Sequence, residues 1–188
     1  ITTGNFFKIN KIDIEDLVFK KTDFKITKED FNLFFDLLKT DPNANKIIFK
    51  DSNIFFKDNK DEVLFINKIS HSKFFYDSNN LENILSSNNE IFNIPFKLNV
   101  KNNKFEKEVS IGFNSKKIRL SVENLINYGE IEKKGILNIS FINKNTSLRY
   151  VIKKDSLKFF SEENNNIYDG LIDFKPFYLI ANFDYDGI

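Results

Sequence analysis

The sequence predicts a mainly β protein in which antiparallel strands form a meander that curls into an open groove. Large apolar residues alternate with polar ones over most of the chain, turn-forming residues separate the alternating runs at short intervals, and helical spacing is rare. A period of two places successive side chains on opposite faces of a strand. Short connections favour antiparallel hairpins. A β-sandwich is the alternative architecture for the same pattern.

The clearest alternating runs cover residues 94–100, 109–113, 118–122, 137–141, 148–152 and 177–185, with shorter ones at 7–9 and 24–26. Asn- and Lys-rich turn signals follow at 101–104, 114–116, 143–145 and 163–166. Pro176 lies inside the last apolar stretch. Because proline cannot donate a ladder hydrogen bond, we expect a bulge or an edge there, with two strand pieces, Leu171–Phe174 and Phe177–Tyr185, and a local change of direction between them. We expect the second piece to be covered on both faces near Pro176 and on one face near Gly187.

One amphipathic helix is predicted at about residues 28–39. Thr27 to Asp30 resembles a capping box, and Asp41-Pro42 provides a stop. The apolar stripe consists of Phe31, Phe34, Phe35 and Leu38. We expect this stripe to pack on the sheet or to plug one end of it. A weaker helical pattern covers Asn80 to Ser86.

Composition limits the function classes. The formal net charge is +1, which disfavours nucleic acid as a partner. There is no Cys, so disulfides, thiolate metal sites and cysteine nucleophiles are excluded within the segment. No apolar run reaches the roughly 18 residues that a membrane helix needs. The chain begins without Met, and we interpret residues 1–188 as a single β-rich segment of a longer protein, with no internal boundary.

No set of residues indicates an enzyme, a cofactor or a metal. His71 is the only histidine, and its position suggests a surface residue in a connection between strands. Asn182, Asp184, Asp186 and Gly187 match the first half of a calcium loop, but the preceding residues alternate as a strand. A strand that ends in an Asp-Gly turn is the simpler interpretation.

A meander with one apolar face must bury that face by closing into a barrel, stacking as a sandwich or curling into a groove. The chain contains 23 Phe, and so many large rings would overfill a small barrel, whereas a curled sheet could line a trough for acyl chains. The pattern alone still favours an ordinary sandwich core.

Two phrases of the sequence resemble the AsmA-like (TamB-like) family of Gram-negative envelope proteins. The first is "NKIIFKDSNIFFKDNKDEVLFINKI" (Asn45 to Ile69), in which strand segments Ile47–Phe49 and Ile54–Lys57 are followed by an Asp58-Asn59 turn and a return strand, Val63–Ile69. The second is "GLIDFKPFYLIANFDYDGI" (Gly170 to Ile188), in which a strand reaching "DFKPF" leads into another long strand. These motifs consist of hydrophobic pattern and a few turn residues, and the likeness covers about half the chain.

The resemblance implies a periplasmic protein, anchored in the inner membrane by a helix outside this segment, whose apolar groove carries phospholipid toward the outer membrane and so contributes to outer-membrane biogenesis. It implies no catalytic residues. Phospholipid acyl chains would be the partner. The alternative is a structural or adhesive β-rich envelope module with a filled core. The candidate lipid-facing residues are Ile94, Phe96, Leu98, Val109, Ile111, Phe113, Ile118, Leu120, Val122, Leu137, Ile139, Phe141, Leu148, Tyr150, Ile152, Phe177, Leu179 and Phe183.

Overall fold

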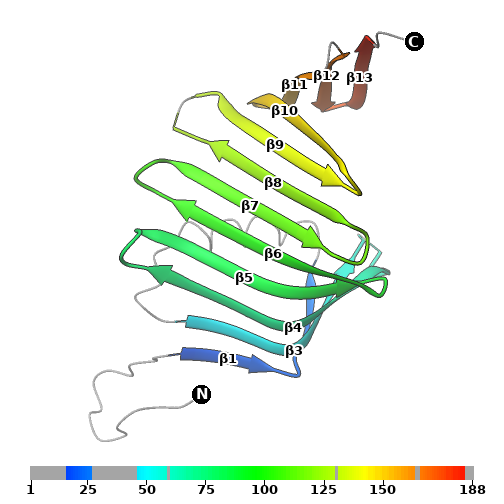
Figure 1. Ribbon diagram of the computed structural model, residues 1–188. Coiled ribbons are helices and arrows are strands. Elements are labelled where there is room, and N and C mark those ends of the chain that lie inside the picture. The colour runs from blue at the N-terminus through cyan, green and yellow to red at the C-terminus, as the bar shows by residue number, and fades with distance from the viewer. Residues whose placement is uncertain (1–15, 27–45, 59, 130, 164–165, 185–188) are drawn as a thin grey trace, which may run out of the picture.

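The computed structural model describes residues 16–26, 46–58, 60–129, 131–163 and 166–184. These residues form one sheet of 13 strands (Figure 1). The strands are β1 (Asp16–Lys20), β2 (Asp23–Ile26), β3 (Lys46–Lys57), β4 (Val63–Asp77), β5 (Glu82–Ile91), β6 (Ile94–Asn103), β7 (Glu108–Ser115), β8 (Leu120–Asn127), β9 (Lys133–Phe141), β10 (Lys144–Lys153), β11 (Ser156–Glu163), β12 (Asn166–Phe174) and β13 (Phe177–Asp184).

Strands β3 to β13 form an antiparallel meander, in which each strand pairs with the next one along the chain. At the start of the sheet, β1 and β2 lie end to end along β3 and both run parallel to it. The described strands form a single open sheet, not the two stacked sheets of a sandwich. The prediction of a mainly β, antiparallel meander is therefore confirmed, with the parallel pairing of β1 and β2 as an unpredicted addition.

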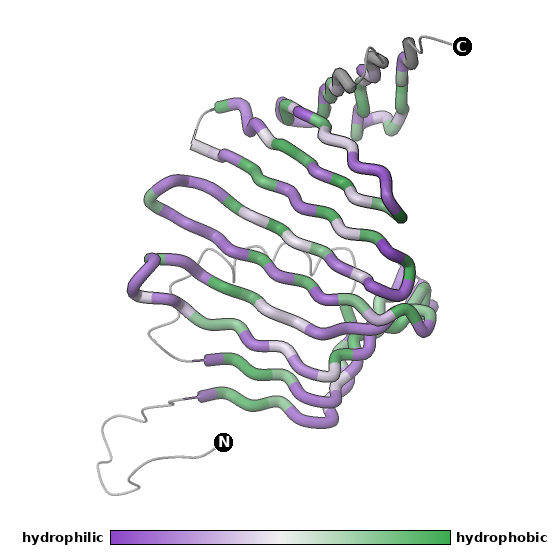
Figure 2. Tube along the Cα trace, viewed as in Figure 1, coloured by the Kyte–Doolittle hydropathy of each residue, from purple (hydrophilic) through white to green (hydrophobic). Residues whose placement is uncertain are grey.

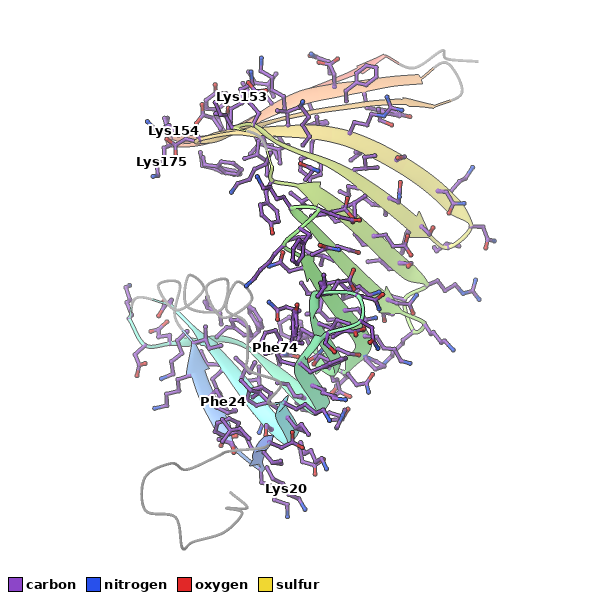
Figure 3. The ribbon with its side chains drawn as sticks, turned by 90° about the vertical axis from the view of Figure 1, so that its left-hand side faces the viewer. Lys20, Phe24, Phe74, Lys153, Lys154 and Lys175 are labelled. Carbon is purple, nitrogen blue, oxygen red and sulfur yellow. The ribbon has the colours of Figure 1, made fainter. Side chains whose placement is uncertain are left out.

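The sheet curls, so that one face is concave (Figure 3). Both β3 and β4 are long, and the ladders that β4 makes with β3 and β5 shift register at two places, one of them at Ser70. Such bulges bend a strand and increase its twist. Phe74 on β4 and Phe24 on β2 lie on the concave side of the curl (Figure 3).

Of three elements predicted from the sequence, one is corrected and two lie outside the described residues. The helix that the pattern at Asn80–Ser86 suggested is wrong, because Glu82–Ile91 is strand β5 and the preceding residues form a turn. Ile84 and Leu85 lie on opposite faces of β5, and only Leu85 joins the core. The predicted helix at 28–39 and the predicted strand at 7–9 lie outside the described residues. Within the described residues, no helix is long and apolar enough to cross a membrane.

The division of the last apolar stretch at Pro176 is confirmed, and the change of direction is a full reversal. Strand β12 ends at Phe174, β13 begins at Phe177, and these two residues pair with each other across the turn. The expectation that β13 is covered on both faces near Pro176 was wrong. Phe177, Leu179 and Ile180 are all exposed, because β13 is the last strand of the described sheet.

Candidate functional site: the concave face

The strand register brings nearly all the candidate apolar residues to one face of the sheet. Across the middle of the sheet, Leu98 pairs with Phe113, Phe113 with Val122, and Val122 with Ile139. Residues that pair across a ladder point to the same face, so these rows form a continuous surface. Leu85 pairs with both Phe74 and Val100 in a neighbouring row, which identifies this surface as the concave face (Figure 3).

The residues that the register and the strand alternation place on the concave face are Ile94, Phe96, Leu98, Val109, Ile111, Phe113, Leu120, Val122, Leu137, Ile139, Phe141, Leu148, Tyr150, Ile152, Phe177 and Leu179. Ile118 is different, because it lies in the turn between β7 and β8 and not in a strand. For Phe183 the structure gives the backbone pairing with Tyr168. The hydropathy along the trace alternates accordingly (Figure 2).

Aromatic rings cluster on this face in the first half of the sheet. Phe19, Phe24 and Phe49 form a triangle with ring centroids 5.2 to 5.5 Å apart, which ties β1 and β2 to β3. Phe96 and Phe113 stack with centroids 4.9 Å apart. Such aromatic pairs contribute about 0.5–1.5 kcal/mol each beyond their burial.

The concave face is buried in one part and exposed in another. Phe74, Leu85 and Val100 form a buried cluster on β4 to β6, and the Phe74 side chain is only 2% exposed. Further along the sheet the same face is more open, since Phe141 at the end of β9 is 49% exposed and Phe177 at the start of β13 is 75% exposed. Tyr150 on β10 is only 8% exposed, so the face changes from a packed core at β3–β7 to an apolar surface at β9–β13 that is accessible in part.

Buried amides interrupt the apolar surface near β4 and β5. Asn67 Nδ2 donates to Asn89 Oδ1 at 3.2 Å, and Ser87 Oγ donates to the same oxygen at 2.9 Å. Asn67 Oδ1 and Asn89 Nδ2 are buried and have no hydrogen-bond partner within the described structure. Alternation cannot reveal such residues, because β5 carries Asn and Ser on both faces.

Two tyrosines also place their hydroxyls on amides of this face. Tyr150 donates to Asn124 Oδ1 at 2.6 Å, and Tyr128 donates to Asn102 Oδ1 at 2.9 Å. Burial raises the pKa of both tyrosines above the ordinary value of 10.0. The hydrogen bond to Asn124 acts in the opposite direction on the pKa of Tyr150. Both hydroxyls are neutral donors near pH 7 that satisfy amide oxygens.

The opposite face carries a patch that alternation did not predict. Leu125, Ile136, Arg149 and Phe160 pair in one row across β8 to β11, and they line a hollow of about 480 Å³. Three of these four side chains are apolar and at least 40% exposed. The face expected to be polar is thus mixed at β8–β11.

The remaining candidate chemistry is dispersed. His71 is exposed in the middle of β4, where it pairs with Lys50 and Asn88, so its predicted place in a connection was wrong. In the half calcium loop, Asn182 donates to Asp169 on the neighbouring strand at 3.1 Å, while Asp186 and Gly187 lie outside the described residues. No group of three or more His, Cys, Asp or Glu residues within the described ranges could hold a metal ion.

The described residues of both phrases that resemble the AsmA-like family belong to the sheet, the first on β3 and β4 and the second on β12 and β13. Comparison with protein-family models, with curated proteins and with solved structures finds no match to this chain. The family resemblance therefore rests on the sequence phrases and stays a prediction.

Proposed function

We propose that this chain is a segment of a periplasmic protein whose curled sheet carries phospholipid between the inner and outer membranes. The observation that carries the proposal is the open sheet with a concave face that is apolar over most of its rows, interrupted by the amides near β4 and β5. Its rows continue from the buried Phe74 cluster to the exposed Phe141 and Leu179. A surface of this kind is unfavourable in water and calls for an apolar occupant.

The chemistry of the face favours an acyl chain over a compact polar ligand. Apart from the amides near β4 and β5, the tyrosine–amide pairs and hydroxyls such as Ser115 and Thr146, its side chains are mostly Phe, Ile, Leu and Val, which make no directional contacts. The amides and hydroxyls are largely engaged with one another. A flexible chain of methylene groups gains about 0.8 kcal/mol for each CH₂ removed from water, without needing a fixed orientation.

The proposal includes the cellular setting that the sequence resemblance implies. The groove segment would belong to a protein anchored in the inner membrane by a part outside this segment. It would contribute to outer-membrane biogenesis by lipid transfer. No catalytic step, cofactor or nucleic acid is involved in this function.

Lipid retention tests the proposal directly. The protein is purified without detergent from a Gram-negative host and examined by native mass spectrometry and by lipid extraction. We expect co-purified phospholipid. Ile139→Asp places a charge on the concave face and should reduce the retained lipid several-fold, because an unpaired charge is costly in an apolar surface. Asn138→Asp, one residue away on the other face, is the matched control and should retain lipid normally.

A structural or adhesive module is the second candidate, and the buried cluster of Phe74, Leu85 and Val100 favours it. That cluster shows that at least part of the concave face is filled by the protein's own side chains. The two functions predict different results in the same experiment. A module with a filled core would carry no lipid, and Ile139→Asp would then lower stability without any change in lipid content.

A further inference from the structure

Three successive turns on one rim of the sheet form a contiguous surface. They connect β5 to β6, β7 to β8, and β9 to β10, and in an antiparallel meander every second turn lies on the same rim (right-hand side of the sheet in Figure 1). We call this surface the cationic turn patch. It consists of Phe92, Lys116, Lys117, Arg119, Ile142 and Lys144.

Hydrogen bonds join the three turns. Lys117 Nζ donates to the Asn93 carbonyl oxygen at 2.7 Å, which ties the second turn to the first. The Ile142 amide donates to the Arg119 carbonyl oxygen at 3.0 Å, which ties the third turn to the second. The patch is therefore a defined surface built from neighbouring turns.

The patch is positively charged throughout. Residues 91–94, 115–120 and 141–144 contain four Lys or Arg and no Asp or Glu. Among the described residues, none of these four cations forms an ion pair, and the nearby Glu90 is paired with Lys68 at 2.8 Å. The neighbouring β3–β4 turn on the same rim carries Asp58, Asp61 and Glu62, so the single sign is confined to these three turns. The turns on the opposite rim mix lysines such as Lys154 with acids such as Asp155. A single-sign cluster of this kind attracts anionic surfaces.

Two residues with large apolar side chains lie beside these cations, and the backbone of both is in an unfavourable conformation. Phe92 is 76% exposed with φ 51°, and Ile142 is 50% exposed with φ 52°. The left-handed region favours Gly or Asn, and a bulky or β-branched residue there is an outlier. Of the ten non-glycine residues with positive φ in the described chain, three are apolar, and two of these are Phe92 and Ile142. Folding gains little from either exposed side chain, which suggests a role outside the fold.

We infer that the cationic turn patch binds the surface of a bilayer that contains anionic phospholipid. The lysines and Arg119 would contact headgroup phosphates, and Phe92 and Ile142 would enter the interface below them. Exposed aromatic and aliphatic tips next to basic residues suit a lipid interface, which offers both negative charge and apolar depth. Nucleic acid would use the charge but would leave the Ile142 tip without a partner. This inference depends on the rim alone and goes beyond the proposed carriage of lipid in the concave face.

Vesicle flotation tests the electrostatic part. The full chain is mixed with vesicles of phosphatidylcholine alone or with one third phosphatidylglycerol, and we expect binding to the anionic vesicles only, weakened by salt. Each basic residue near such a surface contributes about fivefold in affinity, so Lys116→Glu with Lys144→Glu should weaken binding about 25-fold or more. Lys133→Glu with Lys154→Glu, on the opposite rim, makes the same change in net charge and is the control.

Glycine substitutions separate membrane binding from folding. Phe92→Gly removes the apolar tip and relieves the backbone, so it should leave the urea midpoint unchanged or higher while weakening vesicle binding several-fold. Leu81→Gly relieves a similar backbone at φ 57° on the opposite rim and should not alter binding.

The inference is overturned if anionic vesicles are not bound, if the variants on both rims behave alike, or if the patch binds a nucleic acid but no vesicle. Failure of lipid retention in the concave face leaves these outcomes unaffected, because the two measurements address different surfaces.

Discussion

Tyr150 on β10 lies directly opposite Gly135 on β9, and its ring occupies the space that a side chain on Gly135 would need. The relationship repeats two strands further on, where the ring of Phe159 on β11 covers Gly170 on β12. Tyr150 and Phe159 also pair with each other. Two aromatic rings therefore lean in opposite directions over glycines, which lets large side chains fit a row of closely spaced strands.

Gly135→Ala should destabilise the protein, because the new methyl group would overlap the Tyr150 ring. Overpacking of this kind costs about 1–3 kcal/mol. Urea unfolding followed by circular dichroism measures the change. Gly112→Ala is the matched control, since its nearest neighbour would be the Asn99 carbonyl oxygen at 3.9 Å and the backbone is not in the left-handed region. We expect the control to be neutral or slightly stabilising, and equal losses in both variants would contradict the role of Tyr150.

Alkaline pH should weaken the fold through Tyr150 and Tyr128. Their pKa values are raised in the folded state by burial, so the unfolded chain releases these protons first. Between the unfolded pKa near 10.0 and the higher folded pKa, the unfolded state binds fewer protons, and the free energy of unfolding falls as pH rises. The part of the free energy of unfolding that depends on these two protonated hydroxyls is fully present below pH 10. It is lost as the pH rises through the pKa of the folded state.

Tyr150→Phe checks this pH dependence. Near pH 7 the variant loses the hydrogen bond to Asn124 and should be about 1 kcal/mol less stable. Above pH 10 the difference from the parent should shrink, because phenylalanine cannot ionise. Tyr178→Phe, at an exposed site on β13, should follow the parent curve. The measurement is the free energy of unfolding in urea as a function of pH. If this free energy falls equally above pH 10 in Tyr150→Phe and in the parent, burial of Tyr150 does not cause the alkaline loss of stability.

The concave face should respond differently to truncation at its two ends. Phe74→Ala should cost about 3–5 kcal/mol, because Phe74 is buried against Leu85 and Val100. Phe141→Ala should cost less than about 1 kcal/mol, because that ring is half exposed. Under the proposed function, Phe141→Ala should lower lipid retention more than it lowers stability. Similar losses of stability in both variants would mean that the face is packed along its whole length.

Period-two alternation predicted the strands from Ile94 to Ile152 well, since their outer face is mainly polar, with Leu125 and Ile136 as exceptions. It failed at β5, where Asn83, Ser87 and Asn89 are buried on the concave face and erase the contrast between the two faces. The parallel pairing of β1 and β2 with β3 was not predictable either. Alternation shows which residues lie on which face of a strand. It does not show which strands pair, because pairing depends on how the chain connects them.

The sequence pattern also could not predict that the sheet is open and curved. The same alternation fits a sandwich, a barrel or an open sheet, because each of them buries one face. The difference arises from local features such as the shift at Ser70, which bends the long strand β4. The exposed turn residues Phe92 and Ile142 escaped notice for a related reason: a single apolar residue in a turn leaves no periodic signal.

Strand β13 should promote self-association of the purified chain. It is paired only with β12 within the described sheet, and Leu179 and Ile180 are exposed on its two faces. Unpaired backbone groups along an apolar edge are a template for another strand. Ile180→Lys should therefore reduce concentration-dependent association in sedimentation velocity, because a charged edge residue opposes strand pairing.

Ile136→Lys is the control, because it adds the same charge to an exposed site on β9, which has a strand on each side. If the chain associates through its edge, only Ile180→Lys should shift it toward the monomer. An equal shift in both variants would instead assign the association to the exposed apolar face that Ile136 and Ile180 share.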